Sequence, residues 1–259
     1  MAHLQLDKGS SKLSRLDSCA QPRLGLLRGF VLYCDDQQVF LPLSSQRLVA
    51  FVALRDHPLL RLHVATTLWP DSTEERSVAN LRSALWRLRG CGCLLVEASA
   101  SHLRLAPSVP VDYHLVTRRA RRLLDPSTPF VVDDLDEGSF AGDLLPDWYD
   151  DWVVIERERH RQLRLHALES AAERLISAGR HGQAIQAALL AVGEEPLRES
   201  AHRILVRAHL AQGNQGEAIL HYRRYRKALH QELQVEPSAL FDELILGIRR
   251  SEPAEAVRL

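Results

Sequence analysis

The hydrophobic residues between Thr73 and Gly90 recur at the spacing of one helix face. They follow one another at intervals of three, four and three residues: Val78, Leu81, Leu85 and Leu88. This spacing predicts a helix with one apolar stripe. Every charged side chain of the segment from Arg76 onward is cationic. A helix that packs on one side and offers arginines on the other suits the major groove of DNA. A solvated surface helix that binds nothing has the same pattern, so the segment alone leaves both interpretations open.

Both ends of this helix carry boundary signals. Turn-forming residues at 70–73 precede it, and Glu74 and Glu75 fall in its first turn, where the helix dipole favours negative charge. Gly90 is expected to end it, because glycine is the preferred residue just beyond a helix.

The neighbouring segments predict a winged helix-turn-helix. Residues 24–33 and 39–41 predict two short strands. Ser44 or Ser45 is expected to cap a helix with Leu48, Phe51, Val52 and Leu54 or Arg55 on its apolar side, and residues 62–68 predict a second helix. Residues 94–97 and 103–105 predict a hairpin after Gly90. In such an order the third helix enters the major groove and the hairpin contacts the DNA backbone or the adjacent minor groove. His102 and Arg104 on the hairpin are candidates for phosphate contacts, and a solvated strand face is the alternative.

Beyond residue 152 the pattern is helical throughout. Residues 154–179 predict one long helix, and a repeat with an offset of 34 residues follows: Gly179 with Gly213, Ala184 with Ala218, and Ile185 with Ile219. That offset is the period of tetratricopeptide repeats. The two glycines fall where one helix must turn into the next, which needs left-handed backbone. The predicted fold class is therefore an α+β N-terminal winged helix-turn-helix followed by an all-α tetratricopeptide-like helical repeat domain.

Composition limits how such a chain can meet DNA. The 259 residues include 33 basic and 33 acidic side chains, so a nucleic-acid surface has to come from local segregation of charge. The four cysteines, Cys19, Cys34, Cys91 and Cys93, lack zinc-ligand spacing and are interpreted as free thiols in a reducing compartment. No apolar run is long enough to span a membrane and no signal peptide is recognisable, so a cytoplasmic, nucleoid-associated location is expected.

An acidic stretch follows the winged helix, between Asp133 and Asp151. Its spacing matches no calcium loop, so a solvated connector is favoured over a metal site or a hydrolase using these carboxylates. The sequence also lacks a phosphate-binding glycine loop and the common nucleophile and zinc-protease motifs. We therefore expect no enzymatic activity, no cofactor and no metal. The aromatic residues Trp148, Tyr149 and Trp152 are expected to pack against the helix that follows.

Several runs resemble a known family. They are LSSQRLVAFVALRDHP, VATTLWPDS, SVANLRSALWRLR and HLRLAPSVPVDYHLV, and they resemble the DNA-binding half of the bacterial activators called antibiotic regulatory proteins. The exit motif at Val111, Asp112, Tyr113 and Val116 is part of this likeness. The region from Ala184 to the E-L-x-V-E-P-S motif at Glu232–Ser238 resembles the bacterial transcriptional activation domain that accompanies this winged helix. Together the two resemblances cover about residues 22–250.

The resemblance implies a sequence-specific transcription activator of the small, stand-alone type. The implied partners are double-stranded promoter DNA, a second copy of the chain on that DNA, and RNA polymerase, with the sigma factor as the candidate subunit. The expected organisation is a flexible leader (1–21), a winged-helix domain (22–116), a connector and start of the second domain (117–151), a transcriptional activation domain (152–250) and a tail (251–259). The DNA-binding candidates, led by Arg82 and Arg87, are Arg76, Asn80, Arg82, Ser83, Trp86, Arg87, Arg89, His102 and Arg104. The competing hypothesis is a tetratricopeptide-type protein-interaction scaffold without DNA binding.

Overall fold

The computed structural model describes residues 21–129 and 142–250, and its contacts divide the chain into two units. The first unit contains the described residues up to Leu115 together with Gly142–Glu156, and the second contains those that begin at Val116 and at Arg157. The segment Gly142–Glu156 therefore belongs with the first unit, although the sequence places most of it in a connector. The expected tail, Cys19 and the expected leader up to residue 20 lie outside the described residues, as does the acidic stretch up to residue 141.

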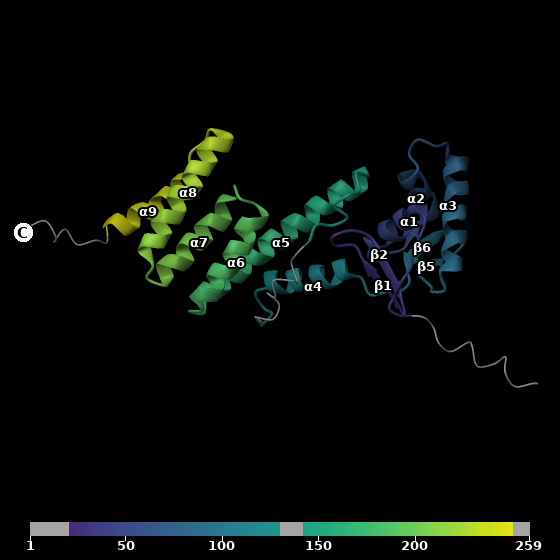
Figure 1. The fold of residues 1–259 in the computed structure, drawn as a ribbon, viewed down its shortest axis with the longest axis horizontal. Helices are drawn as coiled ribbons and strands as arrows, with labels where there is room; N and C mark the ends of the chain where they lie inside the picture. Colours follow the sequence, from purple (N-terminus) through teal and green to yellow (C-terminus); the bar gives the residue numbers. More distant parts are fainter. Residues whose placement is uncertain (1–20, 130–141, 251–259) are drawn as a thin grey trace, which may run out of the picture. The chain divides into compact units, whose positions relative to one another are not determined.

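The first unit begins with a small antiparallel sheet in the order β1-β2-β3: Pro22–Gly25, Val31–Cys34 and Gln37–Gln38 (Figure 1). The single strand expected at 24–33 is wrong, and so is the strand expected at 39–41, since β3 ends at Gln38 and residues 39–41 are not strand. The chain turns at Arg28 and Gly29, whose φ angles of 68° and 133° are incompatible with a continuous strand. Asp35 and Asp36 join β2 to β3 with φ angles of 50° and 63°, the left-handed pair that matches the twist of a two-residue hairpin.

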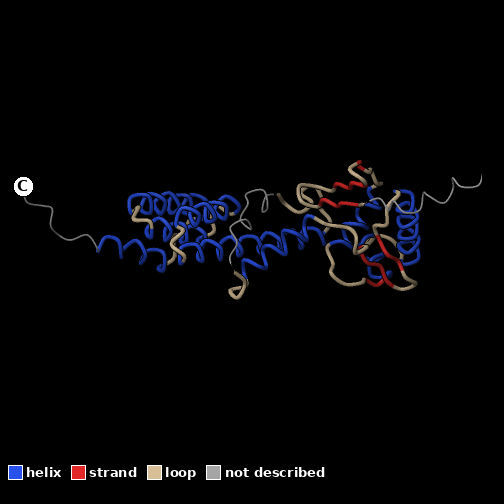
Figure 2. The backbone as a smooth tube through the Cα atoms, turned by 90° about the horizontal axis from the view of Figure 1, so that it is seen from below, coloured by secondary structure: helices blue, strands red, loops and turns tan. Residues whose placement is uncertain are grey.

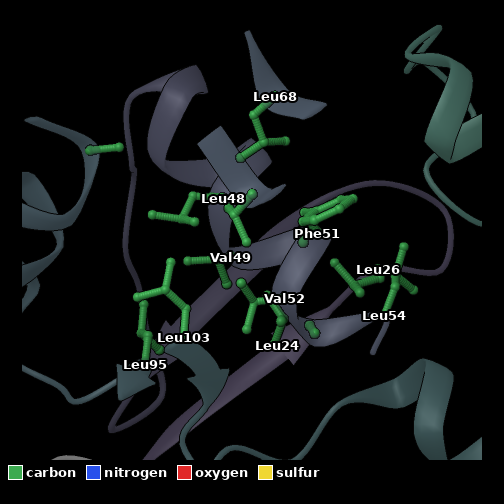
Figure 3. Packing of buried hydrophobic residues seen from close by; sticks show 14 of the residues in the cluster. Leu24, Leu26, Leu48, Val49, Phe51, Val52, Leu54, Leu68, Leu95 and Leu103 are labelled. Carbon is green, nitrogen blue, oxygen red and sulfur yellow. The ribbon is translucent and has the colours of Figure 1, made fainter. Parts of the chain in front are cut away.

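Three helices follow, α1 (Leu43–Ala53), α2 (Arg61–Leu68) and α3 (Glu74–Leu88). The apolar side of α1 fills the centre of the unit, with Leu48 and Phe51 at most 1% exposed (Figure 3). The expected serine cap is wrong, because α1 starts after Pro42 without a side-chain cap. Ser45 is instead fully buried and donates its hydroxyl to the carbonyl of Ala84 in α3 at 3.3 Å.

A second sheet forms the wing, with the strand order β4-β6-β5: Leu59–Leu60, His102–Leu105 and Val96–Ala98. The hairpin of β5 and β6 was expected from the sequence. The strand β4 was not, because two residues are too few to show an alternation of apolar and polar side chains. Leu95 and Leu103 are buried and attach the hairpin to the core around α1 (Figure 3). The wing is therefore a packed part of the unit rather than a free loop.

The segment Gly142–Glu156 closes the first unit. Trp148 stacks on Phe30 with ring centroids 6.1 Å apart, and Trp152 meets the edge of Phe51 at 5.1 Å. Trp148 also meets Trp152 edge-on, with ring centroids 6.3 Å apart, and Trp152 lies in the first turn of the following helix, α5 (Asp151–Ser177). Trp148 therefore contacts that helix as expected, whereas the other two partners, Phe30 and Phe51, come from the loop before β2 and from α1. Tyr149 is 84% exposed and takes no part in this packing.

Within its described residues, the second unit consists of helices joined by loops (Figure 2). It includes most of α4 (Asp112–Leu124) and α5 (Asp151–Ser177), and then α6, α7, α8 and α9: His181–Glu194, Glu199–Ala211, Gln215–Leu233 and Ala239–Arg250. The helix α7 packs against both α6 and α8 (Figure 1). Arg174 of α5 donates to the carbonyls of Leu123, Asp125 and Thr128, which satisfies backbone groups at the end of α4 and in the turn that follows it.

The expected repeat is present in the backbone. Gly179 and Gly213 have φ angles of 72° and 87°, and each begins a turn between two helices. In both turns the next residue donates its amide to a carbonyl five positions earlier, at 2.9 Å from Arg180 to Leu175 and 2.9 Å from Asn214 to His209. This is the Schellman pattern that needs a left-handed glycine. Ala184 and Ala218, one turn further on, are fully buried and let the paired helices approach closely.

The interpretation of the cysteines as free thiols is wrong for two of them. Cys34 and Cys93 are joined by a disulfide, and Cys91 remains a thiol. Among the described residues, no group of three or more histidine, cysteine, aspartate or glutamate side chains could hold a metal ion. Within the same residues, no helix combines the length and apolarity needed to cross a membrane.

Candidate nucleic-acid interface

The inner side of α3 is held firmly on the core. Leu81 and Leu88 are buried as expected, and Val78 and Leu85 pack against the same core while partly exposed. Ala84 completes the packed side and is fully buried. The orientation of the helix is thereby fixed, because rotation would expose this stripe.

Two buried serines connect α3 to its neighbours. The Ser77 hydroxyl donates to the carbonyl of Trp69 at 3.0 Å, across the turn between α2 and α3. Ser45 links α1 to α3 through the bond to Ala84 described above. Both serines are fully buried, and a buried hydroxyl needs such a partner. The helix-turn-helix is therefore fixed by polar contacts as well as by apolar packing.

The end of α3 differs from the expectation. Gly90 does not stop the helix, because the chain continues through a 3₁₀ turn, η1 (Arg89–Cys91). Gly92 then takes the left-handed conformation, with a φ of 80°, and directs the chain into the wing.

The outer side of α3 carries two polar stripes. The first contains four candidates spaced by four, three and four residues: Arg76, Asn80, Ser83 and Arg87. All are exposed except Asn80, which is half-buried. Arg87 donates to the hydroxyl of Ser44 at 3.2 Å, and Ser83 donates to the carbonyl of Ala79 within the helix at 3.1 Å. This stripe therefore runs along the side of α3 that faces the start of α1.

The second stripe contains Arg82, Trp86 and Arg89, spaced by four and three residues, and it faces the wing. Together with the segment from Cys93 to Ala98, these side chains line a hollow of about 650 Å³. Trp86 is 72% exposed. Such exposure is unusual for a large aromatic side chain whose only role is to pack in a core. The stripe thus offers two guanidinium groups with a large aromatic surface between them.

Arg61 lines the same hollow and was not among the residues expected from the sequence. It begins α2, and its side chain donates to the carbonyl of Ser99 in the wing at 3.2 Å. The sequence gives little sign of this, since Arg61 directly precedes the segment predicted to be helical and belongs to no periodic pattern. The structure brings it to the side of Arg82 and Arg89.

The two wing candidates have different surroundings. His102 is exposed, and its ring lies 2.8 Å from the Ser101 hydroxyl. Arg104 forms an ion pair with Glu97 on the neighbouring strand, with Nε 2.6 Å from the carboxylate. The two residues are directly opposite in the hairpin register. This pairing reduces the positive charge that the wing can offer to a phosphate.

The fold and the exposed cationic helix define the class of the protein: a winged helix-turn-helix unit followed by a tetratricopeptide-like helical unit. A solved structure of EmbR from Mycobacterium tuberculosis, in complex with a low-affinity phosphopeptide, has a similar fold. The TM-score is 0.64, the sequence identity is 20%, and the match covers 90% of this chain and 66% of the EmbR chain.

The sequence profile of the Bacterial transcriptional activator domain matches residues 116–249, and the chain belongs to this family. Two regulatory proteins named AfsR are similar. The one from Streptomyces griseus is 24% identical over 196 residues, which cover 71% of this chain and 20% of that protein. The one from Streptomyces coelicolor is 30% identical over 115 residues, or 44% of this chain and 12% of that protein. The chain thus spans about a fifth of the curated relatives or less. The resemblance to activators of the antibiotic regulatory protein type is confirmed.

Proposed function

We propose that this chain is a sequence-specific DNA-binding transcription activator that places α3 in the major groove of promoter DNA. The observation that carries the proposal is the outer side of α3 and its following turn, where four arginines are exposed while the inner side of the helix is fixed to the core. A single helix fits the major groove of B-form DNA, where arginine can donate two hydrogen bonds to guanine. Membership of a transcriptional regulator family supports this interpretation.

The arrangement suggests different tasks for the two stripes. Ser83 and Trp86 occupy the middle of the outer side, and we propose that they meet base edges, with Trp86 contacting a thymine methyl group. Arg82 and Arg87 flank them on opposite sides and are our first candidates for guanine contacts. Arg76 and Arg89 lie near the helix ends, where phosphate contacts are expected. Asn80 is half-buried and is expected to position the helix or contact one base.

The wing is expected to meet the DNA backbone beside this groove. His102 is exposed for such a contact, whereas Arg104 has to leave Glu97 or act together with it. Arg61 supplies a further cation from α2 on the same side of α3 as Arg82 and Arg89. We propose that the helical unit contacts RNA polymerase, with the sigma factor as candidate subunit, and that two copies of the chain bind one promoter in the cytoplasm.

The first experiment measures DNA affinity by fluorescence polarisation. Binding sites are selected from a pool of random duplexes with the full chain, and the enriched sequence is titrated at several salt concentrations. Replacing Arg82 and Arg87 together by alanine should weaken binding by about thirtyfold or more, since each base contact contributes ~1–3 kcal/mol. The matched control is Arg223→Ala with Arg224→Ala, two exposed cations of α8 that make the same change in net charge.

Three results are decisive for this experiment. A folded Arg82→Ala, Arg87→Ala protein with wild-type affinity would contradict the assignment of α3. A control variant as weak as the α3 variant would show that overall charge governs binding rather than this helix. Failure of the wild-type chain to retain any duplex at about 50 mM salt, where phosphate contacts are strongest, would favour the scaffold hypothesis.

A second experiment addresses activation itself. Transcription from the selected promoter is measured with purified bacterial RNA polymerase holoenzyme, with and without the chain. The wild-type chain should raise transcript yield, and the Arg82→Ala, Arg87→Ala variant should not. Tight DNA binding without any increase in transcript would make the protein a DNA-binding regulator that is not an activator.

A further inference from the structure

Three cysteines meet where α3 gives way to the wing. Cys34 ends β2, and its disulfide partner Cys93 lies between η1 and β5, with the two Cα atoms 6.7 Å apart. The thiol of Cys91 lies on the same turn, and its Sγ is 3.7 Å from the Sγ of Cys93. A free thiol is therefore almost in contact with one sulfur of a disulfide.

The accessibility of the three sulfur-bearing residues differs. Cys34 is only 8% exposed, whereas Cys91 and Cys93 are half-buried. Cys93 also lines the hollow between α3 and the wing. A small thiol or peroxide can thus approach the Cys91–Cys93 side of the group more easily than the Cys34 side.

We propose that Cys34, Cys91 and Cys93 form a thiol–disulfide exchange site. The Cys91 thiolate attacks the Sγ of Cys93, a Cys91–Cys93 bond forms, and the Cys34–Cys93 bond breaks. Cys34 leaves as a thiolate and takes up the proton that Cys91 gave to solvent. This step needs neither an oxidant nor a reductant, because one disulfide replaces another. The first disulfide forms from two thiols and one molecule of hydrogen peroxide, with two molecules of water as the other product.

The local backbone allows this exchange. Gly92 alone separates the two cysteines and has a φ of 80°, and apart from its two chain neighbours no residue has an atom within 4 Å of the position of an added Cβ. The Cys91 thiol now donates to the carbonyls of Leu88 at 2.9 Å and Cys93 at 3.2 Å. Because the thiolate is the attacking species in such an exchange, the exchange should accelerate as pH rises.

Exchange would change how the wing is held. The Cys34–Cys93 disulfide is a covalent connection between the N-terminal sheet and the residue that leads into β5. The Cys91–Cys93 isomer removes that connection and closes a small ring at the end of α3 instead. The consequence for DNA affinity rests on the proposed function, whereas the exchange chemistry does not.

Tryptic peptide mapping without reduction distinguishes the isomers directly. Trypsin leaves Cys34 on the peptide 29–47, and Cys91 and Cys93 together on the peptide 90–104. The Cys34–Cys93 isomer therefore gives these two peptides as a cross-linked pair. The Cys91–Cys93 isomer gives the peptide 90–104 alone, lighter by two hydrogen atoms than its reduced form. The full chain is reduced, oxidised with hydrogen peroxide, incubated at a series of pH values and quenched with acid and an alkylating agent.

The expected result is that the single oxidised peptide increases with pH at the expense of the cross-linked pair. Cys91→Ser should give the cross-linked pair alone, and this variant removes only one half-buried sulfur. Wild-type protein that yields one isomer at every pH would overturn the proposal, and so would alkylation of all three of Cys34, Cys91 and Cys93 after peroxide.

DNA affinity provides the second measurement. Cys91→Ser protein is oxidised to lock the Cys34–Cys93 isomer, and Cys34→Ser protein is oxidised to lock the Cys91–Cys93 isomer. We expect their dissociation constants for the selected duplex to differ by about fivefold or more, a usual size for coupling between two sites. If peptide mapping shows the expected disulfide in each variant and the two variants bind the duplex with equal affinity, the exchange does not control DNA binding. Absence of DNA binding by either variant and by the wild type would refute the proposed function while the peptide map still stands.

Discussion

The carboxylate of Asp112 ties the N-terminal sheet to the start of α4, and its removal should destabilise the first unit. Its two oxygens accept the amides of Leu26 at 2.8 Å and Leu27 at 3.1 Å. Leu26 is fully buried. An Asp112→Ala protein therefore leaves a buried donor without its acceptor, which is more costly than the loss of an exposed hydrogen bond.

The magnitude follows from these two bonds. A hydrogen bond to a charged group contributes about 1.5–3 kcal/mol, and water can reach the half-buried Asp112 position and replace part of the loss. The free energy of unfolding of the first unit should then fall by about 3 kcal/mol in Asp112→Ala. Asp112→Asn keeps one acceptor oxygen and turns a donor toward the other amide, so a loss of about 2 kcal/mol is expected.

Amide hydrogen exchange measures this directly. The protection of the fully buried Val49 in α1 should fall by about a hundredfold in Asp112→Ala, which corresponds to the expected 3 kcal/mol. The matched control is Asp36→Asn, in which the lost carboxylate is 89% exposed and paired with Arg23 at 2.7 Å. Surface pairs of this kind contribute little. An Asp112→Ala protein within about 0.5 kcal/mol of the wild type would refute the reasoning, because that is the usual effect of an unremarkable surface substitution.

Two further predictions concern the helical unit. Burial, with a smaller contribution from the Arg164 charge, lowers the pKa of His160 to about 4. Below pH 6.5 the imidazole of the unfolded chain takes up a proton while that of the folded chain does not. The free energy of unfolding should therefore fall by about 3 kcal/mol between pH 6.5 and pH 4. Urea titrations should show a smaller dependence of this free energy on pH in His160→Gln than in the wild type, and equal dependence would contradict the assignment. Gly213→Ala should destabilise the unit by about 1 kcal/mol because the glycine φ is 87°. Gly193→Ala, inside α6, should instead stabilise the unit by up to about 1 kcal/mol, because alanine has the higher helix propensity. Thermal unfolding measures both effects, and a shift of the melting temperature in the same direction for both variants would contradict the backbone argument.

Features set by neighbouring residues could be predicted from the sequence. The inner stripe of α3 was evident because helix geometry fixes which residues share a side. The turns at Gly179 and Gly213 followed from the repeat, since similar local sequences favour similar backbone angles. The pairing of Arg104 with Glu97 is also local, because the predicted hairpin places these two residues on adjacent antiparallel strands.

Features that depend on distant parts of the chain were missed. Cys34 and Cys93 are separated by 59 positions, and no periodic pattern brings them together. The same is true of Trp148, whose ring lies on Phe30, and of Arg61, which reaches the wing only through tertiary packing. Residues of this kind have ordinary local sequence, so only the assembled core shows what they contact.

The exposure of Trp86 gives the protein an intrinsic optical reporter. The chain has four tryptophans, and the other three, Trp69, Trp148 and Trp152, are buried or packed against the core of the first unit. A water-soluble quencher should therefore reach Trp86 first, and shielding of its indole by a duplex would show, without any added dye, that this side of α3 has become covered.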